Sequence, residues 1–151
     1  MKSSTAIHSM VERCRAGDYP PAVGRLNAGW LVIGERQVLP GYCLLLPDPV
    51  VPDLNALEGD ARHEFMAEMC SIGDALLSVT GAVRVNYAIF GNVEPALHAH
   101  LFPRRADEPE AIRTAQPWAL DWHAAPSFSQ TTHRGLKEGL LQELQRRRML
   151  R

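Results

Sequence analysis

Hydrophobic residues follow two different spacings along this chain, and each spacing predicts a kind of element. Residues 60–79 carry apolar side chains at intervals of three or four, which is typical of a helix with one buried face. That face consists of Phe65, Met69, Ile72, Leu76 and Val79. Asp60 is the expected N-cap of this helix, and Gly81 is its expected C-terminal stop. Residues 1–18 and 131–151 show similar spacing, so we expect helices there too.

Short apolar runs with β-branched or aromatic members predict strands elsewhere. Residues 29–35 and 42–47 are two such runs, and the Pro-Gly signal between them predicts a hairpin. Residues 83–90 are rich in strand-forming residues, and 96–102 alternate between two sets of side chains. Residues 103–117 are charged and contain prolines, so we expect a loop there.

The order of these elements predicts the fold class. Helix, hairpin, helix, strand pair, loop and helix follow one another without the alternation that builds a parallel sheet. The pattern therefore predicts an α+β fold with an antiparallel sheet. A length of 151 residues fits a single domain, residues 1–151.

Alternation in 96–102 separates the side chains of the last predicted strand. Leu97, Ala99 and Leu101 lie on one face and can pack against the long helix. His98 and His100 share the opposite face. One face of this strand is therefore core, and the other presents two imidazoles.

Charge and cysteine content narrow the class of protein. A formal net charge of −1 gives no general affinity for nucleic acid or acidic membranes, so we expect neither as a partner. No stretch reads as a secretory signal or a membrane span. Cys14, Cys43 and Cys70 are an odd number without a CxxC pair, which predicts buried free thiols in a reducing cytoplasm.

Three roles fit a His-x-His pair on a strand. The pair can lie on an exposed sheet face without function, or it can bind a metal together with a third ligand. Alternatively, one neutral imidazole attacks phosphorus while the other handles a proton or a phosphate oxygen. Arg104 and Arg105 would supply cations for that chemistry. Candidates for a third metal ligand are His63, His123, His133 and Asp121.

The segment "GNVEPALHAHLFPR", residues 91–104, resembles the signature of the histidine triad family, His-φ-His-φ-His-φ-φ followed by Pro-Arg. The segment "PGYCLLLPDPVVPDLNALEGDARHEFM" is similar to the family's second strand and helix entry, and "PWALDW" to the aromatic tail of a bacterial branch. Together the resemblance covers most of residues 26–123.

The resemblance implies a five-stranded antiparallel sheet with a long helix and a C-terminal helix, assembled as a homodimer. It also implies nucleotide hydrolase or nucleotidyl transferase chemistry without a cofactor or a metal. His98 is then the nucleophile that forms a nucleotidyl-histidine intermediate, and His100 binds phosphate oxygen or assists the leaving group. Asn92 is similar to the family's amide beside the nucleophile, and we take Asn86 and Arg104 as further substrate-binding candidates.

Three positions depart from the family pattern. Ala96 replaces the first histidine, so the triad is a dyad. Asp48 replaces a basic residue, which predicts a site less favourable to polyphosphate. Gly34 occupies the position of the family's ribose-binding Asp, and Glu35 beside it is the candidate to bind ribose instead.

Three hypotheses follow from the sequence. The first is a hydrolase for a dinucleoside polyphosphate, such as diadenosine tetraphosphate, or for an adenylylated small molecule. The second is a non-catalytic module that binds a mononucleotide, which Ala96 and Asp48 favour. The third is a metal-dependent hydrolase that uses His98 and His100. Trp118 and Trp122 would either cap the site or form a dimer contact.

Overall fold

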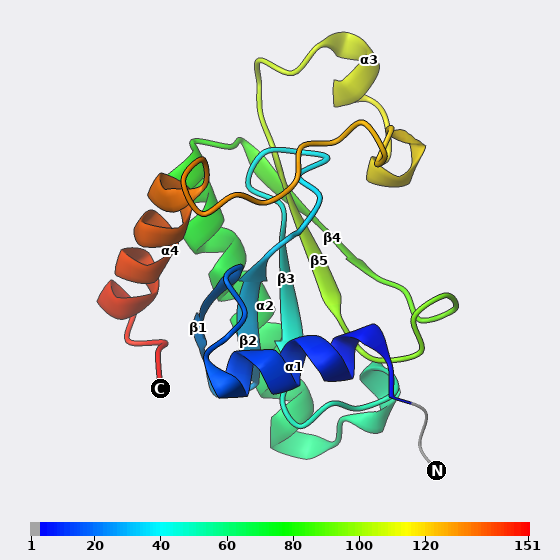
Figure 1. The fold of residues 1–151 in the computed structure, drawn as a ribbon, viewed down its shortest axis with the longest axis vertical. Helices are drawn as coiled ribbons and strands as arrows, with labels where there is room; N and C mark the ends of the chain where they lie inside the picture. The colour runs from blue at the N-terminus through cyan, green and yellow to red at the C-terminus, as the bar shows by residue number, and fades with distance from the viewer. Residues whose placement is uncertain (1–3) are drawn as a thin grey trace.

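The computed structural model describes residues 4–151 and contains a five-stranded antiparallel sheet (Figure 1). The strands run in the order β1-β2-β3-β5-β4 across the sheet. Their bounds are β1 (Ala22–Arg25), β2 (Gly29–Ile33), β3 (Cys43–Pro47), β4 (Arg84–Ile89) and β5 (Ala99–Arg104). The predicted α+β class and the hairpin of β2 and β3 are confirmed.

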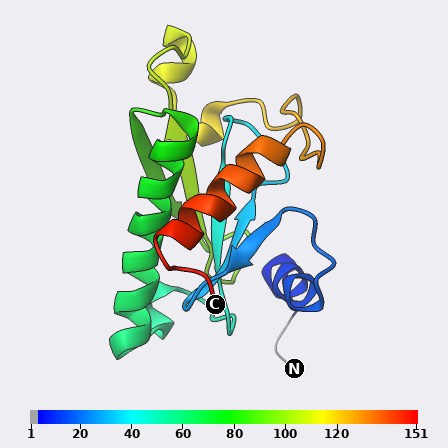
Figure 2. The ribbon, with the colours of Figure 1, turned by 90° about the vertical axis from the view of Figure 1, so that its left-hand side faces the viewer.

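Helices cover both faces of the sheet (Figure 2). The long helix α2 packs on one face, with the C-terminal helix α4 against α2 and β1. The N-terminal helix α1 packs on the opposite face. The α-helices are α1 (Ala6–Ala16), α2 (Gly59–Thr80), α3 (Glu110–Arg113) and α4 (Arg134–Arg146), and the 3-10 helices are η1 (Leu54–Ala56) and η2 (Pro117–Ala119). The first three residues of the helix predicted over 1–18 lie outside the described residues.

Strand alternation divides the hydrophobic core into two clusters, as predicted for β5. Leu97, Ala99 and Leu101 pack in the aliphatic cluster under α2. Phe102 belongs to the cluster on the α1 face, which also contains Tyr42. His98 and His100 therefore project from β5 on the α1 side of the sheet.

Two predicted boundaries are wrong. The N-cap of α2 is Glu58, without a side-chain cap, and Asp60 lies in the first turn of the helix. The predicted loop at 103 begins later, because β5 continues through Pro103 to Arg104. Pro103 is tolerated there because pairing with β3 stops at Leu101, so the missing N–H removes no bond on that side. Gly81 is confirmed as the C-cap, with a φ of 68°.

The cysteine prediction holds for two of the three residues. Cys14 and Cys43 are buried free thiols, and burial raises the pKa of Cys14 to about 11. Cys70 is exposed on α2, so its predicted burial is wrong. Within residues 4–151, none of the helices has both the length and the apolar character needed to cross a bilayer.

Candidate active site

His98 lies just before β5 and is held by a backbone acceptor. Its Nδ1 is 2.7 Å from the carbonyl oxygen of Ala96, and the side chain is buried. A carbonyl oxygen can only accept a hydrogen bond, so Nδ1 must carry the proton. In the neutral imidazole, Nε2 of His98 then keeps its lone pair, which is the form that acts as a nucleophile.

His100, two residues later, is held by a side chain. Its Nδ1 lies 2.7 Å from the hydroxyl of Tyr42. Burial, and then the neighbouring charge of His98, lower the pKa of His100 from 6.5 to about 4. The two imidazole rings lie 4.7 Å apart at 74°. His100 is therefore neutral at pH 7.

A cavity of about 470 Å³, here called the histidine pocket, opens beside the two imidazoles. Asn92, in the loop between β4 and β5, lines the same pocket. The structure therefore brings three of the predicted site residues together, His98, His100 and Asn92. The other lining residues are Phe90, Val93, Glu94, Gln116 and Trp118.

Glu94 and Trp118 are pocket residues that the sequence analysis did not assign to substrate. Glu94 accepts a hydrogen bond from the backbone N–H of Ile7 at 3.4 Å, which places it against the first turn of α1. The ring of Trp118 lies 5.0 Å from that of His100 and 4.8 Å from that of Phe90, at nearly right angles to both. Trp118 therefore covers the site, which was one of its two expected roles.

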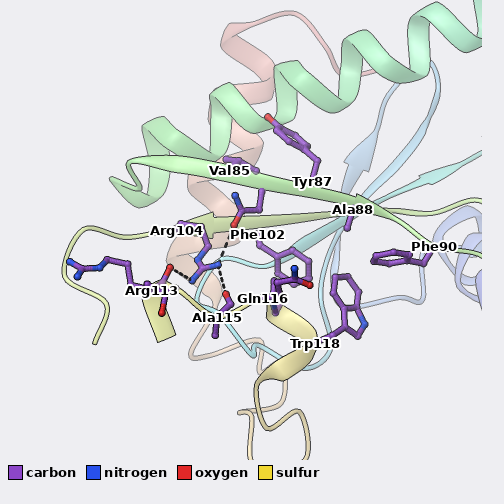
Figure 3. A pocket seen from close by; sticks show the side chains of 13 residues that line it. Val85, Tyr87, Ala88, Phe90, Phe102, Arg104, Arg113, Ala115, Gln116 and Trp118 are labelled. Atoms are coloured by element: carbon purple, nitrogen blue, oxygen red, sulfur yellow. Dashed lines mark hydrogen bonds between the residues drawn. The ribbon is translucent and has the colours of Figure 1, made fainter. Parts of the chain in front are cut away.

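A second cavity of about 650 Å³, here called the arginine cavity, adjoins the histidine pocket (Figure 3). The two share Phe90, Gln116 and Trp118 in their walls. Asn86 and Arg104 line the arginine cavity and contact each other, with Arg104 Nη1 3.2 Å from Asn86 Oδ1. These two predicted binding residues therefore lie together in the arginine cavity, whereas the imidazoles line the adjoining histidine pocket.

The guanidinium of Arg104 is fully engaged in the fold. Its Nε and Nη2 donate to the carboxylate of Glu108, with Nη2 at 2.8 Å from Oε2. Backbone carbonyls of Arg113 and Ala115 accept further bonds (Figure 3). The carbonyl of Ile112 accepts another, from Nη2 at 2.7 Å. Arg105 likewise pairs with Asp107. Each guanidinium of this arginine pair therefore already has a carboxylate partner.

Glu35 lies apart from the imidazoles. Its Oε1 accepts a hydrogen bond from the hydroxyl of Tyr19 at 2.9 Å, and it lines a third hollow with Arg36 and Phe128. The strand β2 ends at Ile33, so Glu35 lies beyond the end of the strand. The structure does not bring the predicted ribose-binding carboxylate to the histidine pocket.

The acidic departure at position 48 is neutralised locally. Asp48 pairs with Arg15 and Arg25, and it accepts a hydrogen bond from Trp30 Nε1 at 3.0 Å. The hydrogen bond from Arg15, above all, lowers the pKa of Asp48 below its ordinary value. The charge of this carboxylate is therefore compensated by two guanidiniums.

No third metal ligand accompanies the imidazoles in residues 4–151. Within these residues, no group of three or more His, Cys, Asp or Glu side chains lies close enough together to hold a metal ion. The metal hypothesis required such a ligand.

The fold is that of histidine triad proteins. A histidine triad protein from Bradyrhizobium japonicum superposes with a TM-score of 0.71 at 20% identity, over 99% of this chain and 100% of that chain. A hypothetical histidine triad nucleotide-binding protein from Sulfolobus tokodaii gives 0.71 at 11% identity, over 91% and 92%. A zinc-bound histidine triad family protein from Mycobacterium smegmatis gives 0.62 at 21% identity, over 91% and 96%. No family model matches the sequence, and no curated protein matches it.

Proposed function

We propose that this protein is a nucleotide hydrolase or nucleotidyl transferase that works through a nucleotidyl-histidine intermediate on His98. The observation that carries the proposal is the hydrogen bond from His98 Nδ1 to the Ala96 carbonyl. In the neutral imidazole this bond leaves the lone pair on Nε2, beside a cavity that His100 and Asn92 also line. The histidine triad fold of the solved structures supports the same chemistry.

The reaction proceeds in two displacements at phosphorus. In the first, Nε2 of His98 forms a bond to the phosphorus as the bond to the leaving group breaks. The positive charge that develops on the imidazole is stabilised by the Ala96 carbonyl, to which Nδ1–H donates. In the second, water attacks the same phosphorus, the N–P bond breaks and one water proton is released. His98 returns to its neutral form.

Loss of the first triad histidine is compatible with this mechanism. The group that fixes the tautomer of His98 is the backbone carbonyl of residue 96, and any side chain at this position provides it. The replacement of the first histidine by Ala96 therefore removes a side chain but keeps the hydrogen bond that holds His98 Nδ1.

Nucleotides with a group beyond the reacting phosphate suit the two adjoining cavities. The histidine pocket receives the scissile phosphate, and the arginine cavity supplies room and amide groups for the remainder of the substrate. A dinucleoside polyphosphate such as diadenosine tetraphosphate, or an adenylylated small molecule, has this form. The Sulfolobus structure, described as nucleotide-binding, supports the nucleotide part of the proposal.

Intact-mass spectrometry tests the intermediate directly. The protein is mixed briefly with adenylylated and guanylylated substrates and quenched, and a mass gain of one nucleotide is expected. The His98→Ala variant should show no mass gain. The His133→Ala variant should still show it, because His133 lines neither the histidine pocket nor the arginine cavity. A gain that persists in His98→Ala contradicts the assignment of the nucleophile.

A non-catalytic nucleotide-binding module is the second candidate, because Ala96 leaves the triad incomplete. It predicts mononucleotide binding by calorimetry and no mass gain with any substrate. Turnover that disappears on treatment with a chelator would instead favour a metal-dependent hydrolase.

We also propose that two copies of the chain associate through β4. This strand is one of the two edges of the sheet, and it carries the exposed side chain of Tyr87 between exposed Val83 and Phe90. An unpaired strand edge with apolar side chains favours pairing with a second edge. A dimeric mass in sedimentation is expected, and a monomeric mass contradicts it. The free thiols of Cys14 and Cys43 fit a reducing cytoplasm.

A further inference from the structure

The geometry points to Tyr42 as a positioning residue for the proposed reaction, which fixes His100 as a neutral hydrogen-bond donor. Tyr42 immediately precedes β3 and lies on the α1 side of the sheet. The inference rests on the proposed function for its role in catalysis. The tautomer of His100 can be measured whether or not the protein turns over a substrate.

Hydrogen-bond accounting decides the direction of the bond between Tyr42 and His100. The tyrosine is 4% exposed, and in residues 4–151 its hydroxyl has one partner, His100 Nδ1 at 2.7 Å. If Nδ1 were the donor, the hydroxyl hydrogen would be buried without an acceptor, which costs about 1–3 kcal/mol. The hydroxyl therefore donates to Nδ1, and the proton of the neutral imidazole is on Nε2.

Packing holds the Tyr42 ring in this position. The ring stacks on Phe102 with centroids 4.5 Å apart and an interplanar angle of 9°. Trp122 packs edge-on against it at 5.5 Å. The buried amide of Gln37 donates to the carbonyl oxygen of Tyr42 at 2.8 Å, which ties the backbone to the preceding turn. The hydroxyl is thus fixed by contacts on the ring and on the backbone.

The residue opposite the ring explains one departure from the family pattern. A Cβ atom at Gly34 would lie 2.2 Å from Tyr42 Cδ1, so any side chain at position 34 would displace the ring. The position that the resemblance assigns to a ribose-binding carboxylate is therefore occupied in space by Tyr42. Gly34 and Tyr42 form a matched pair, in which the missing side chain makes room for the ring that holds His100.

The two imidazoles consequently have opposite roles at the same pH. His98 presents a lone pair on Nε2, because its Nδ1 donates to a carbonyl. His100 presents an N–H on Nε2, because its Nδ1 accepts from a hydroxyl. That N–H can donate to an oxygen of the phosphoryl group while His98 attacks the phosphorus. The low pKa of His100, about 4, keeps it in this neutral form.

Tyr42→Phe tests the inference by removing only the hydroxyl. We expect kcat to fall about tenfold with KM within twofold, since the lost contact acts on His100 in the transition state. We also expect ¹⁵N NMR to show His100 protonated on Nε2 in the native protein and a mixture of tautomers in the variant. Tyr19→Phe is the matched control, because it removes another buried tyrosine hydroxyl, bonded to Glu35. Its kcat and the His100 tautomer should not change.

The outcomes separate this inference from the proposed function. An unchanged tautomer in Tyr42→Phe, or a native His100 protonated on Nδ1, overturns the inference. Absence of turnover by the native protein, together with the expected change of tautomer, overturns the proposed function and leaves the assignment of the hydrogen bond standing. A kcat equal to the native value, with the tautomer changed, overturns the catalytic role of the bond. Far-ultraviolet circular dichroism checks that both variants fold.

Discussion

The side chains from His98 to Arg104 that share one face of the β5 segment differ greatly between the start and the end of this row. At its start, His98 and His100 each use one ring nitrogen in a hydrogen bond to the protein, and the other nitrogen has no partner within residues 4–151. At its end, Arg104 uses Nε and both terminal nitrogens, all of them in bonds to the protein. Both ends are polar and enclosed. Within residues 4–151, only the first end retains side-chain nitrogens that make no hydrogen bond to the protein.

The difference shows why residue type alone is a poor guide to a phosphate site. An arginine next to a catalytic histidine pair suggests a cation for phosphate. Here the guanidinium instead braces the segment 112–115, whose backbone carbonyls it binds. That segment leads into Gln116 and Trp118, which line the histidine pocket. Arg104 therefore supports the site by holding its wall.

Arg104→Met removes the hydrogen bonds of the guanidinium at the end of this row, and it should produce the largest loss of stability of the variants considered. The change leaves the carboxylate of Glu108, with a side chain 10% exposed, without its cation. We expect the free energy of unfolding to fall by about 4 kcal/mol in urea denaturation. Arg105→Met removes an exposed partner of Asp107 and should cost much less stability than Arg104→Met. Equal losses in the two variants would show that Arg104 is not a brace.

Ala96→His tests whether the chemical end of the row can accept the missing third imidazole. Ala96 is fully buried in the cluster on the α1 face, so the larger side chain must displace its neighbours. We expect a loss of about 2 kcal/mol in stability and no gain in turnover. Val93→His, at a position that is 99% exposed in the same loop, is the control for stability and should leave the free energy of unfolding nearly unchanged. Higher turnover in Ala96→His would mean that the dyad lacks a required group.

The pH dependence of stability sharpens the description of His100. Its pKa is about 4 in the folded protein and near 6.5 when unfolded, so between these values the unfolded chain binds more protons at this residue. The free energy of unfolding should therefore fall as the pH is lowered from 6.5 to 4, by about 1–2 kcal/mol. Denaturation series across this range should show the slope in the native protein and a smaller one in His100→Asn. Parallel curves for the two proteins would contradict the buried, neutral state of His100.

Much of the frame of this site could be predicted from the sequence. Alternation placed His98 and His100 opposite the aliphatic face of β5, because the two faces of a strand differ strictly by parity. The strand β1 was missed, since it is four residues long and its register is broken between Ala22 and Gly24. A run this short has no periodicity to detect.

The partners of the site residues could not be predicted, because they depend on register and on backbone atoms. Tyr42 precedes the β3 residues that pair with β5, and only the register of Cys43 with Leu101 places it beside His100. Arg104 is held largely by carbonyl oxygens, which every residue has and which carry no sequence signal. Glu94 reaches the pocket through a loop with no regular pattern.

The position of Trp118 gives the protein a built-in optical reporter. Its indole is 45% exposed and lies in the shared wall of the histidine pocket and the arginine cavity. The other two indoles have their N–H groups bonded within the protein, Trp30 to Asp48 and Trp122 to Pro117. An occupant of either cavity changes the solvent around Trp118 first, so intrinsic fluorescence follows filling of the site without any attached dye.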